Sequence, residues 1–275
     1  MSDAYAASAL TGKIAVVTGG AQGLGEASAR LMAARGAAGI VLVDRKADAG
    51  EQVAQSLREA GTPTIFVKAD LADPADVARV IPAADAEFGR VDILANIAGL
   101  TDRGSILDTD QTLFDRMFAI KVRAPFFLMQ DAITVMLREK TEGSIVNILS
   151  MNAHLGSPTL SAYSASKAAL LNLTKNTAAA MNTARIRANG IALGWVETPG
   201  EHEVLRKFHN AQDDWVEKAE ASLPFGRLLK PHDVARIVTF LASAESWPMT
   251  GAVIDYEQSV FGAWGAGIAG YPGKD

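Results

Sequence analysis

Residues 18–25, TGGAQGLG, decide the fold, because they place four glycines between an apolar run and an Ala-rich stretch. The apolar run IAVVTG (14–19) is continuously hydrophobic, as expected for a parallel strand covered on both faces. Glycines at 19, 23 and 25 let the chain turn sharply into a helix and approach a ligand closely. Because a helix start presents free N–H groups and a positive dipole, the turn favours an anion such as a pyrophosphate.

The same alternation of apolar runs and Ala-rich stretches continues along the chain. Strands are predicted over 14–19, 39–44, 64–70, 91–99, 144–150, 185–194 and 252–256, and helices over 23–35, 48–59, 74–88, 110–137, 161–181 and 231–242. This order predicts an α/β fold, a doubly wound parallel sheet with helices on both faces in three layers. Since no linker, repeat or low-complexity tract interrupts the pattern, we expect a single domain over residues 1–275.

Composition excludes several classes of function. The chain has 275 residues, a net charge of −5 and no cysteine. The acidic balance gives no reason to expect nucleic acid or an anionic membrane as a partner, and disulfides and thiolate chemistry are excluded. No metal site is expected, since His202 and His209 lack a ligand spacing. Neither a signal peptide nor a membrane-spanning run is recognisable, which predicts a cytoplasmic protein.

Polar residues follow several of the predicted strands. Asp44 ends the second strand, 19 residues after Gly25, where a carboxylate accepts the ribose hydroxyls of a dinucleotide. It would repel a 2′-phosphate, so NAD is favoured over NADP, although Arg45 could serve a phosphate and Asp44 could be a simple turn residue. Asp70 and the NIAG stretch (96–99) end two further strands, and all should meet at one edge of the sheet.

The stretch AYSASK (162–167) adds a candidate for proton transfer. Tyr163 and Lys167 lie one helical turn apart, on the same face. A lysine ammonium favours the phenolate, so we expect Lys167 to lower the pKa of Tyr163 toward the range of a useful general base. Ser150 ends the fifth strand, where its hydroxyl can hold the reacting oxygen. A Tyr–Lys pair alone also arises by chance on many helices, so the argument depends on the whole set.

Taken together, the chain resembles the short-chain dehydrogenase/reductase family. The matching residues are TGGAQGLG (18–25), Asp70, NIAG (96–99), Ser150, YSASK (163–167) and GWVET (194–198), and the match extends from about residue 12 to 256. The resemblance implies a Rossmann-type fold with Tyr163 as acid/base, Lys167 as its activator and Ser150 as the group that polarises the substrate oxygen.

The resemblance also implies which residues bind the cofactor, taken to be NAD, and how subunits assemble. Val196 and Thr198 would hold the nicotinamide carboxamide. The helices around 110–137 and 161–181 would form a homodimer or homotetramer interface. The implied cofactor-binding residues are Gly19, Gln22, Gly23, Leu24, Gly25, Asp44, Asp70, Leu71, Asn96, Ala98, Gly99, Tyr163, Lys167, Val196 and Thr198.

Two positions depart from the family pattern. Leu193 replaces a proline before Gly194, which should change little. Lys121 stands where the family has an asparagine that usually kinks the helix and holds a water connecting the active-site lysine to solvent. A lysine there can still donate a hydrogen bond but adds a second cation, and we hypothesise that the proton relay is rebuilt around it.

Two segments break the rhythm of strands and helices. Residues 197–224 form a polar insertion that we interpret as a lid, with a plain surface excursion as the alternative. The tail, 259–275, is rich in glycine but carries aromatic residues, so it should pack on the protein or on a neighbouring subunit. Candidate substrate contacts are Asn152, His154 and Ser157, between Ser150 and Tyr163.

The sequence therefore predicts an NAD-dependent oxidoreductase that interconverts a secondary alcohol and a ketone, with Tyr163 as general base. The polar lid and loop favour a small hydroxylated substrate such as a sugar or polyol. Steroids, acyl thioesters and xenobiotic ketones stay open, because one scaffold serves many substrates. The alternative is a non-catalytic NAD(H) sensor or scaffold protein, which Lys121 alone supports and the intact Ser150, Tyr163 and Lys167 oppose.

Overall fold

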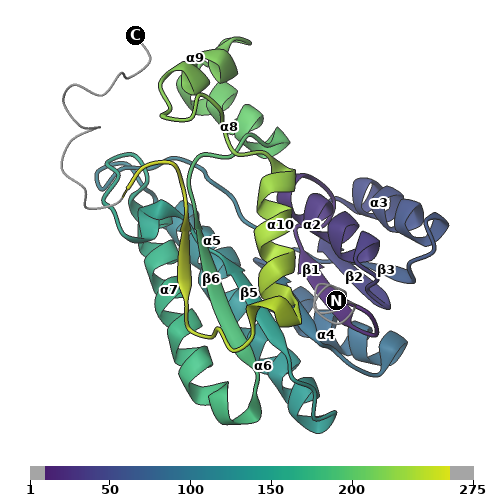
Figure 1. Cartoon of the computed structure of the whole chain (residues 1–275). Helices are drawn as coiled ribbons and strands as arrows, with labels where there is room; N and C mark the ends of the chain where they lie inside the picture. Colours follow the sequence, from purple (N-terminus) through teal and green to yellow (C-terminus); the bar gives the residue numbers. More distant parts are fainter. Residues whose placement is uncertain (1–9, 261–275) are drawn as a thin grey trace, which may run out of the picture.

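The computed structural model describes residues 10–260, in which seven parallel strands form one sheet in the order β3-β2-β1-β4-β5-β6-β7 (Figure 1). The strands are β1 (Ile14–Thr18), β2 (Gly39–Asp44), β3 (Thr64–Lys68), β4 (Ile93–Asn96), β5 (Ser144–Ile148), β6 (Arg187–Leu193) and β7 (Val253–Tyr256). The predicted doubly wound Rossmann-type sheet is thereby confirmed.

The strand order reverses next to β1, and this reversal positions the site. The chain runs outward from β1 through β2 to β3, then returns to place β4 on the other side of β1. The connections after β1 and β4 therefore diverge, which leaves a crevice at the carboxyl ends of these strands. The Thr18 hydroxyl joins the two ends by accepting hydrogen bonds from the Ile97 and Ala98 N–H groups, at 2.9 and 3.1 Å.

Helices cover both faces of the sheet. One layer contains α2 (Gly23–Ala34), α3 (Ala47–Glu59) and α10 (Pro231–Ala242), and the other contains α4 (Pro74–Phe88), α5 (Gln111–Phe118), α6 (Ala124–Arg138) and α7 (Ser161–Met181). Side chains of β1 show how the two cores are filled: Ala15 and Val17 face the α2 and α10 side, whereas Val16 faces α4 and α6. This alternation explains why the strand is apolar at every position.

The prediction of one helix over 110–137 is wrong in detail, because a π-helical turn, η1 (Ala119–Arg123), separates α5 from α6. The Ala124 N–H donates to the carbonyl of Ala119, five residues back instead of four. Pro125 contributes to the break, since it has no N–H to donate to the carbonyl of Lys121. The wider turn carries Lys121, whose side chain is 3% exposed. Such turns often occur at functional sites.

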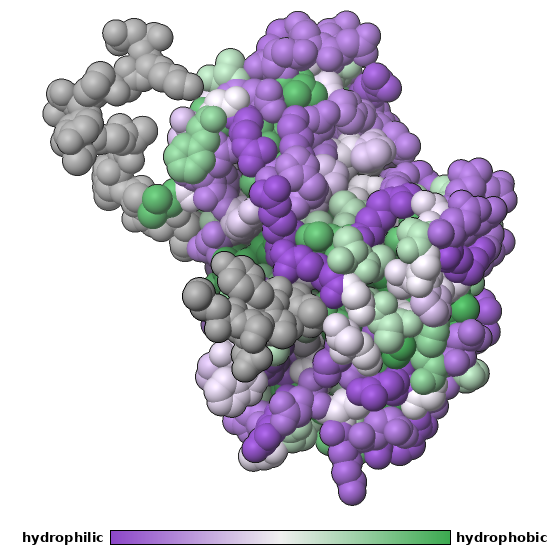
Figure 2. Space-filling view, turned by 45° about the vertical axis from the view of Figure 1, so that its right-hand side comes forward, coloured by the Kyte–Doolittle hydropathy of each residue, from purple (hydrophilic) through white to green (hydrophobic). Residues whose placement is uncertain are grey.

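The polar insertion folds into α8 (Pro199–His209) and α9 (Trp215–Ala221), above the carboxyl edge of the sheet (Figure 1). It has a small core of its own, formed by Leu205, Trp215, Ala219 and Leu228. Its outer surface, at the top of Figure 2, is mainly hydrophilic. Of the tail that we expected to pack on the protein, residues 261–275 lie outside the described residues. Within residues 10–260, no helix is long and apolar enough to cross a membrane.

Candidate active site

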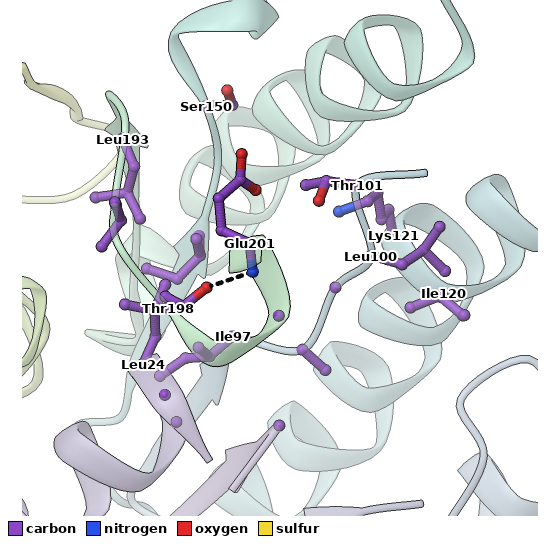
Figure 3. Close-up of a pocket in the computed structure, with 18 of the residues that line it drawn as sticks. Leu24, Ile97, Leu100, Thr101, Ile120, Lys121, Ser150, Leu193, Thr198 and Glu201 are labelled. Carbon is purple, nitrogen blue, oxygen red and sulfur yellow. Dashed lines mark hydrogen bonds between the residues drawn. The ribbon is translucent and has the colours of Figure 1, made fainter. Parts of the chain in front are cut away.

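A cavity of about 650 Å³ opens at the carboxyl edge of the sheet, below α8 (Figure 3). It is lined by the glycine turn, the ends of β2, β4 and β5, the start of α7 and the segment after β6. Most of the predicted site residues lie on its wall: Gly19, Gln22, Gly23, Leu24, Gly25, Asp44, Asp70, Leu71, Ala98, Gly99, Ser150, Asn152, Tyr163, Lys167, Val196 and Thr198. The sheet therefore brings together residues that are up to 179 positions apart (19 to 198).

One end of the cavity is suited to a phosphate. The helix α2 begins there, and its N-cap residue, Gln22, offers no side-chain hydrogen bond to the first turn. In α4, by contrast, Asp73 caps the helix by accepting from the Ala75 N–H at 2.9 Å. The uncapped N–H groups of α2 are left to bind an anion. Gly25 is required for this turn, since a Cβ on it would lie 2.1 Å from the carbonyl oxygen of Gly19.

Asp44 stands beside this turn at the end of β2. Its carboxylate accepts from the Ala21 N–H at 3.2 Å and from the Lys46 N–H at 3.0 Å, so its position is fixed by the backbone. Arg45 and Lys46 line the cavity next to it. The Lys46 amine donates to the Gln22 side chain at 2.8 Å. A carboxylate for ribose hydroxyls and two cations for a phosphate thus lie at the same end of the cavity.

The other end of the cavity holds the residues that the sequence predicts for proton transfer. Ser150 follows β5, and Tyr163 and Lys167 lie in the first two turns of α7. The Lys167 amine donates to the Ile148 carbonyl at 2.5 Å and lies 5.9 Å from the centre of the Tyr163 ring. Burial lowers the pKa of Lys167 to about 8.

The pKa of Tyr163 does not follow the expectation from the sequence. Burial raises it above 10, and a hydrogen bond with Ser150 opposes that rise. Two groups further away add smaller effects: Glu201 raises the pKa and Arg103 lowers it. We expected Lys167 to lower the pKa of Tyr163, but Lys167 is not among the groups that shift it. The Lys167 amine is directed at the Ile148 carbonyl instead. Another positive charge must therefore act on Tyr163 before it can serve as a base near neutral pH.

Lys121 is the feature of this site that sets it apart. Its amine lies 4.6 Å from the centre of the Tyr163 ring, closer than the amine of Lys167. Burial, together with the neighbouring Lys167, holds the pKa of Lys121 well below 10.5. In Figure 3 its amine points into the cavity beside Thr101. Two lysine amines therefore share the surroundings of one tyrosine.

Sequence reasoning missed a charged group on the lid side of the cavity. Glu201, in the first turn of α8, directs its carboxylate into the cavity on the side of Ser150 and Lys121 (Figure 3). It is paired with Arg103 at 3.4 Å and accepts from the Trp195 indole at 3.1 Å. The Thr198 hydroxyl caps α8 by accepting from the Glu201 N–H at 3.0 Å. The signal in the sequence was the polar insertion, but its helical register was needed to identify Glu201.

Three predicted site residues lie away from the cavity wall. Asn96 is buried within the sheet, where its amide donates to the Asn147 side chain at 2.9 Å. His154 turns toward β7 and contacts Asp255 at 3.2 Å. Ser157 lies in the same loop and is not part of the lining. Of the three candidate substrate residues, only Asn152 borders the cavity among the described residues.

The cavity fits a dinucleotide. A helix start without a cap is suited to a phosphate, Asp44 carries acceptors of the kind that bind ribose hydroxyls, and the Tyr163 end carries the residues predicted for proton transfer. At Gly25 any side chain would collide with the Gly19 carbonyl, so the close backbone packing of this turn requires glycine there. In residues 10–260, no group of three or more His, Asp or Glu side chains is placed to hold a metal ion.

Comparison with known proteins shows which family the chain matches. A family model described as enoyl-(acyl carrier protein) reductase matches residues 6–257. Cis-4-hydroxycyclohexanecarboxylate dehydrogenase of Sinomonas cyclohexanicum is 34% identical over 88% of this chain and 94% of its own length. Galactitol 2-dehydrogenase of Agrobacterium fabrum is 33% identical over 86% of this chain and 93% of its own.

A solved structure with the same fold contains a bound nucleotide. It is a putative NAD(P)-dependent gluconate 5-dehydrogenase from Beutenbergia cavernae, with bound NADP at low occupancy. The two structures align with a TM-score of 0.82 and 31% sequence identity, over 91% of this chain and 97% of the other.

Proposed function

The chain belongs to the short-chain dehydrogenase/reductase family, as an oxidoreductase acting on CH–OH groups, and we propose that it uses NAD to interconvert a secondary alcohol and a ketone on a small polyhydroxylated substrate. The observation that carries the proposal is the grouping of Ser150, Tyr163 and Lys167 at one end of a cavity whose other end is built for a dinucleotide. When bound, the nicotinamide supplies the carbon that accepts or returns a hydride.

The residues of the chain supply the proton transfer. Ser150 holds the substrate oxygen by a hydrogen bond, and Tyr163 takes the proton of the hydroxyl group as the carbinol carbon is oxidised. In the opposite direction Tyr163 returns this proton to the carbonyl oxygen. Lys167 is fixed by the Ile148 carbonyl one turn from Tyr163, and its amine lies 5.9 Å from the centre of the Tyr163 ring.

The preference for NAD rests on Asp44. Its carboxylate is held toward the cavity by two backbone N–H groups, and a 2′-phosphate placed there would meet a negative charge. Arg45 and Lys46 act in the opposite sense, and a structural relative holds NADP. We propose that the fixed carboxylate outweighs the two cations, because Lys46 is engaged with Gln22.

The proposed substrate class rests on the lid side of the cavity. Glu201 and Asn152 provide acceptors and donors for hydroxyl groups, and Trp195 provides an apolar surface of the kind that packs against C–H groups. A relative that acts on galactitol is consistent with this class. We propose that α8 and α9 form a lid, since they carry Glu201 above the cavity (Figure 1).

The test is a titration of the protein with NADH and with NADPH, followed by fluorescence, and a panel of polyols, sugars and cyclic hydroxy acids assayed with NAD⁺. We expect tighter binding of NADH and turnover of at least one polyol. Tight NADH binding without turnover on any alcohol, even at high pH, would favour the sensor instead. Tighter binding of NADPH would contradict the role of Asp44.

We also propose that α5 and α6 form a subunit interface of a homodimer or homotetramer in the cytoplasm. Phe114, Phe126 and Phe127 are 42–45% exposed on these helices, which is unusual for three neighbouring phenylalanines. Phe127→Glu should lower the mass measured by sedimentation to that of a smaller assembly, and an unchanged mass would contradict the interface.

A further inference from the structure

Lys121 and Lys167 place two amines beside one phenol, and this arrangement restricts how many protons the three groups hold. Both lysines are buried, at 3% and 4% exposure. Both amines lie near the Tyr163 ring, at 4.6 and 5.9 Å from its centre, and each lysine affects the pKa of the other. Two ammonium groups cannot hydrogen-bond to one another, since neither has an acceptor lone pair. One of the two amines must therefore be neutral when they are in contact.

The surroundings identify the neutral amine. Lys167 donates to the Ile148 carbonyl, and a carbonyl acceptor favours the charged form of its donor. Lys121 is reached by no carboxylate or carbonyl among the hydrogen bonds and ion pairs of residues 10–260. Its amine fits against Gly99, where a Cβ would lie only 2.7 Å away. Lys167 thus keeps the proton, and Lys121 is the neutral amine.

We propose that Lys121 and Lys167 share a single proton in the resting protein, and that the neutral Lys121 takes up the proton that Tyr163 gives up when it becomes a base. In this step the O–H bond of Tyr163 breaks and an N–H bond forms on Lys121. The three groups pass from one cation to two cations and one phenolate. Their net charge stays at +1, so the transfer brings no uncompensated charge into the buried site.

The two protonation states support one another. While Tyr163 is a neutral phenol, burial and Lys167 keep Lys121 neutral. Once the phenolate forms, a Lys121 ammonium 4.6 Å from the ring centre has an anionic partner. The attraction to this anion offsets the burial and the charge of Lys167, which otherwise disfavour the ammonium form of Lys121. The protein thereby supplies the additional positive charge that Tyr163 lacks in the resting state. Lys121 acts through Tyr163 and Lys167 and does not need to touch the substrate.

Other charged groups border the same cavity. Arg103 precedes α5, Arg116 lies on α5, and Glu201 comes from α8. Arg103 and Glu201 are paired, and their effects on the pKa of Tyr163 have opposite signs. They therefore shift the pKa of Tyr163, but neither is a free base that could take its proton. Among the charged groups of residues 10–260 that border the cavity, Lys121 is the one that has both a neutral amine and a position close to the Tyr163 ring.

The proton shared by the lysines is tested directly by NMR of protein labelled with ¹³C and ¹⁵N in lysine. Lys121→Met identifies the Lys121 signal, and Lys175→Met identifies a matched exposed lysine on α7. We expect the Lys121 side chain to show the shift of a neutral amine at pH 7 while Lys167 shows that of an ammonium. Titration of Lys121 together with Lys175 would overturn the proposal. This readout needs no turnover, so its failure is distinguishable from failure of the proposed function.

The proton uptake rests on the proposed function and is tested by the pH dependence of kcat/KM in Lys121→Met and Lys121→Arg. Methionine keeps the volume without a base, and arginine keeps a cation that cannot accept a proton. We expect the pH of half-maximal oxidation to rise by at least about one unit in Lys121→Met, a tenfold change in proton activity. In Lys121→Arg we expect it to fall, because the permanent cation favours the phenolate in the resting protein as well. Lys175→Met should keep the original profile.

Each alternative role of Lys121 gives a different result. If Lys121→Met kept the original pH profile, Lys121 would only fill space. If Lys121→Arg kept the original pH profile, a fixed positive charge at this position would be enough to explain the role of Lys121. Either result overturns the proposal. Circular dichroism and NADH titration of the Met variant establish that the fold and the cofactor site are intact, and the NMR result stands even if the Arg variant does not fold.

Discussion

The two ends of the active-site cavity are built in different ways. The phosphate end consists of backbone: a glycine turn, the uncapped start of α2 and an aspartate held by main-chain N–H groups. The proton-transfer end consists of buried side chains from α7 and from the π-helical turn η1, whose charges depend on one another. A backbone site needs particular residues at particular positions. A site of coupled side chains tolerates substitution, and a new residue can change which group holds a proton. Lys121, beside Tyr163 and Lys167, is an example.

The largest effect is expected at the proton-transfer end. Tyr163→Phe removes the group that takes the substrate proton, and we expect kcat to fall by about 10²- to 10⁴-fold. Because the phosphate end is unchanged, the affinity for NADH should stay within about twofold of the original. Steady-state kinetics and a fluorescence titration measure both. A comparable loss of NADH affinity would contradict the separation of the two ends.

The next largest effect is expected at the phosphate end. In Gly25→Ala the new Cβ would overlap the Gly19 carbonyl, so the turn must shift, and we expect the Kd for NADH to rise about a hundredfold, or about 3 kcal/mol. Gly156→Ala is the matched control, since a Cβ there has open space. Unchanged NADH binding in Gly25→Ala would show that the turn does not contact the nucleotide.

A smaller effect is expected from the carboxylate at the ribose position. Asp44→Ser removes the charge that opposes a 2′-phosphate and leaves Arg45 and Lys46 in place. We expect the ratio of NADH to NADPH affinities to shift toward NADPH by about tenfold, or about 1.4 kcal/mol. Asp48→Ser, which removes an exposed carboxylate in the first turn of α3, should leave the ratio unchanged. An unaltered ratio in Asp44→Ser would mean that the cations already decide the preference.

The smallest effect concerns stability. The folded chain holds the pKa of Lys121 well below 10.5, so the unfolded chain binds the extra proton at neutral pH, and this lowers the free energy of unfolding. Lys121→Met removes that penalty and should raise the Tm at pH 7 by a few degrees, since about 1 kcal/mol shifts Tm by about 2–4 °C in a chain of this size class.

The pH dependence of that gain distinguishes charge from packing. As the pH rises toward 10.5, the lysine of the unfolded chain increasingly loses its proton as well, so the gain in Tm should shrink. Thermal unfolding at pH 7 and pH 10 measures the difference. An equal gain at both values would attribute it to the apolar methionine alone.

Much of the fold could be predicted from the chain because the relevant signals are local. Val16 and its neighbours are apolar on both parities, which indicates a strand covered on two faces, and Pro74 and Pro231 mark helix starts. The π-helical turn could not be predicted from hydrophobic periodicity, since its residues continue the apolar pattern of α5 and α6. It depends on a missing donor at Pro125 and on packing against α7.

By itself the sequence determined the order of strands and helices, the glycine turn, Asp44 and the set of Ser150, Tyr163 and Lys167, because each requires a residue type at a fixed local spacing. Only the tertiary structure decided that Glu201 enters the cavity, that His154 turns away toward Asp255, and that Lys121 lies against Tyr163 and Lys167. The physical reason is that the direction of a side chain and the charge of a buried amine depend on neighbours far apart in the chain, which meet only when the sheet and its helices are packed.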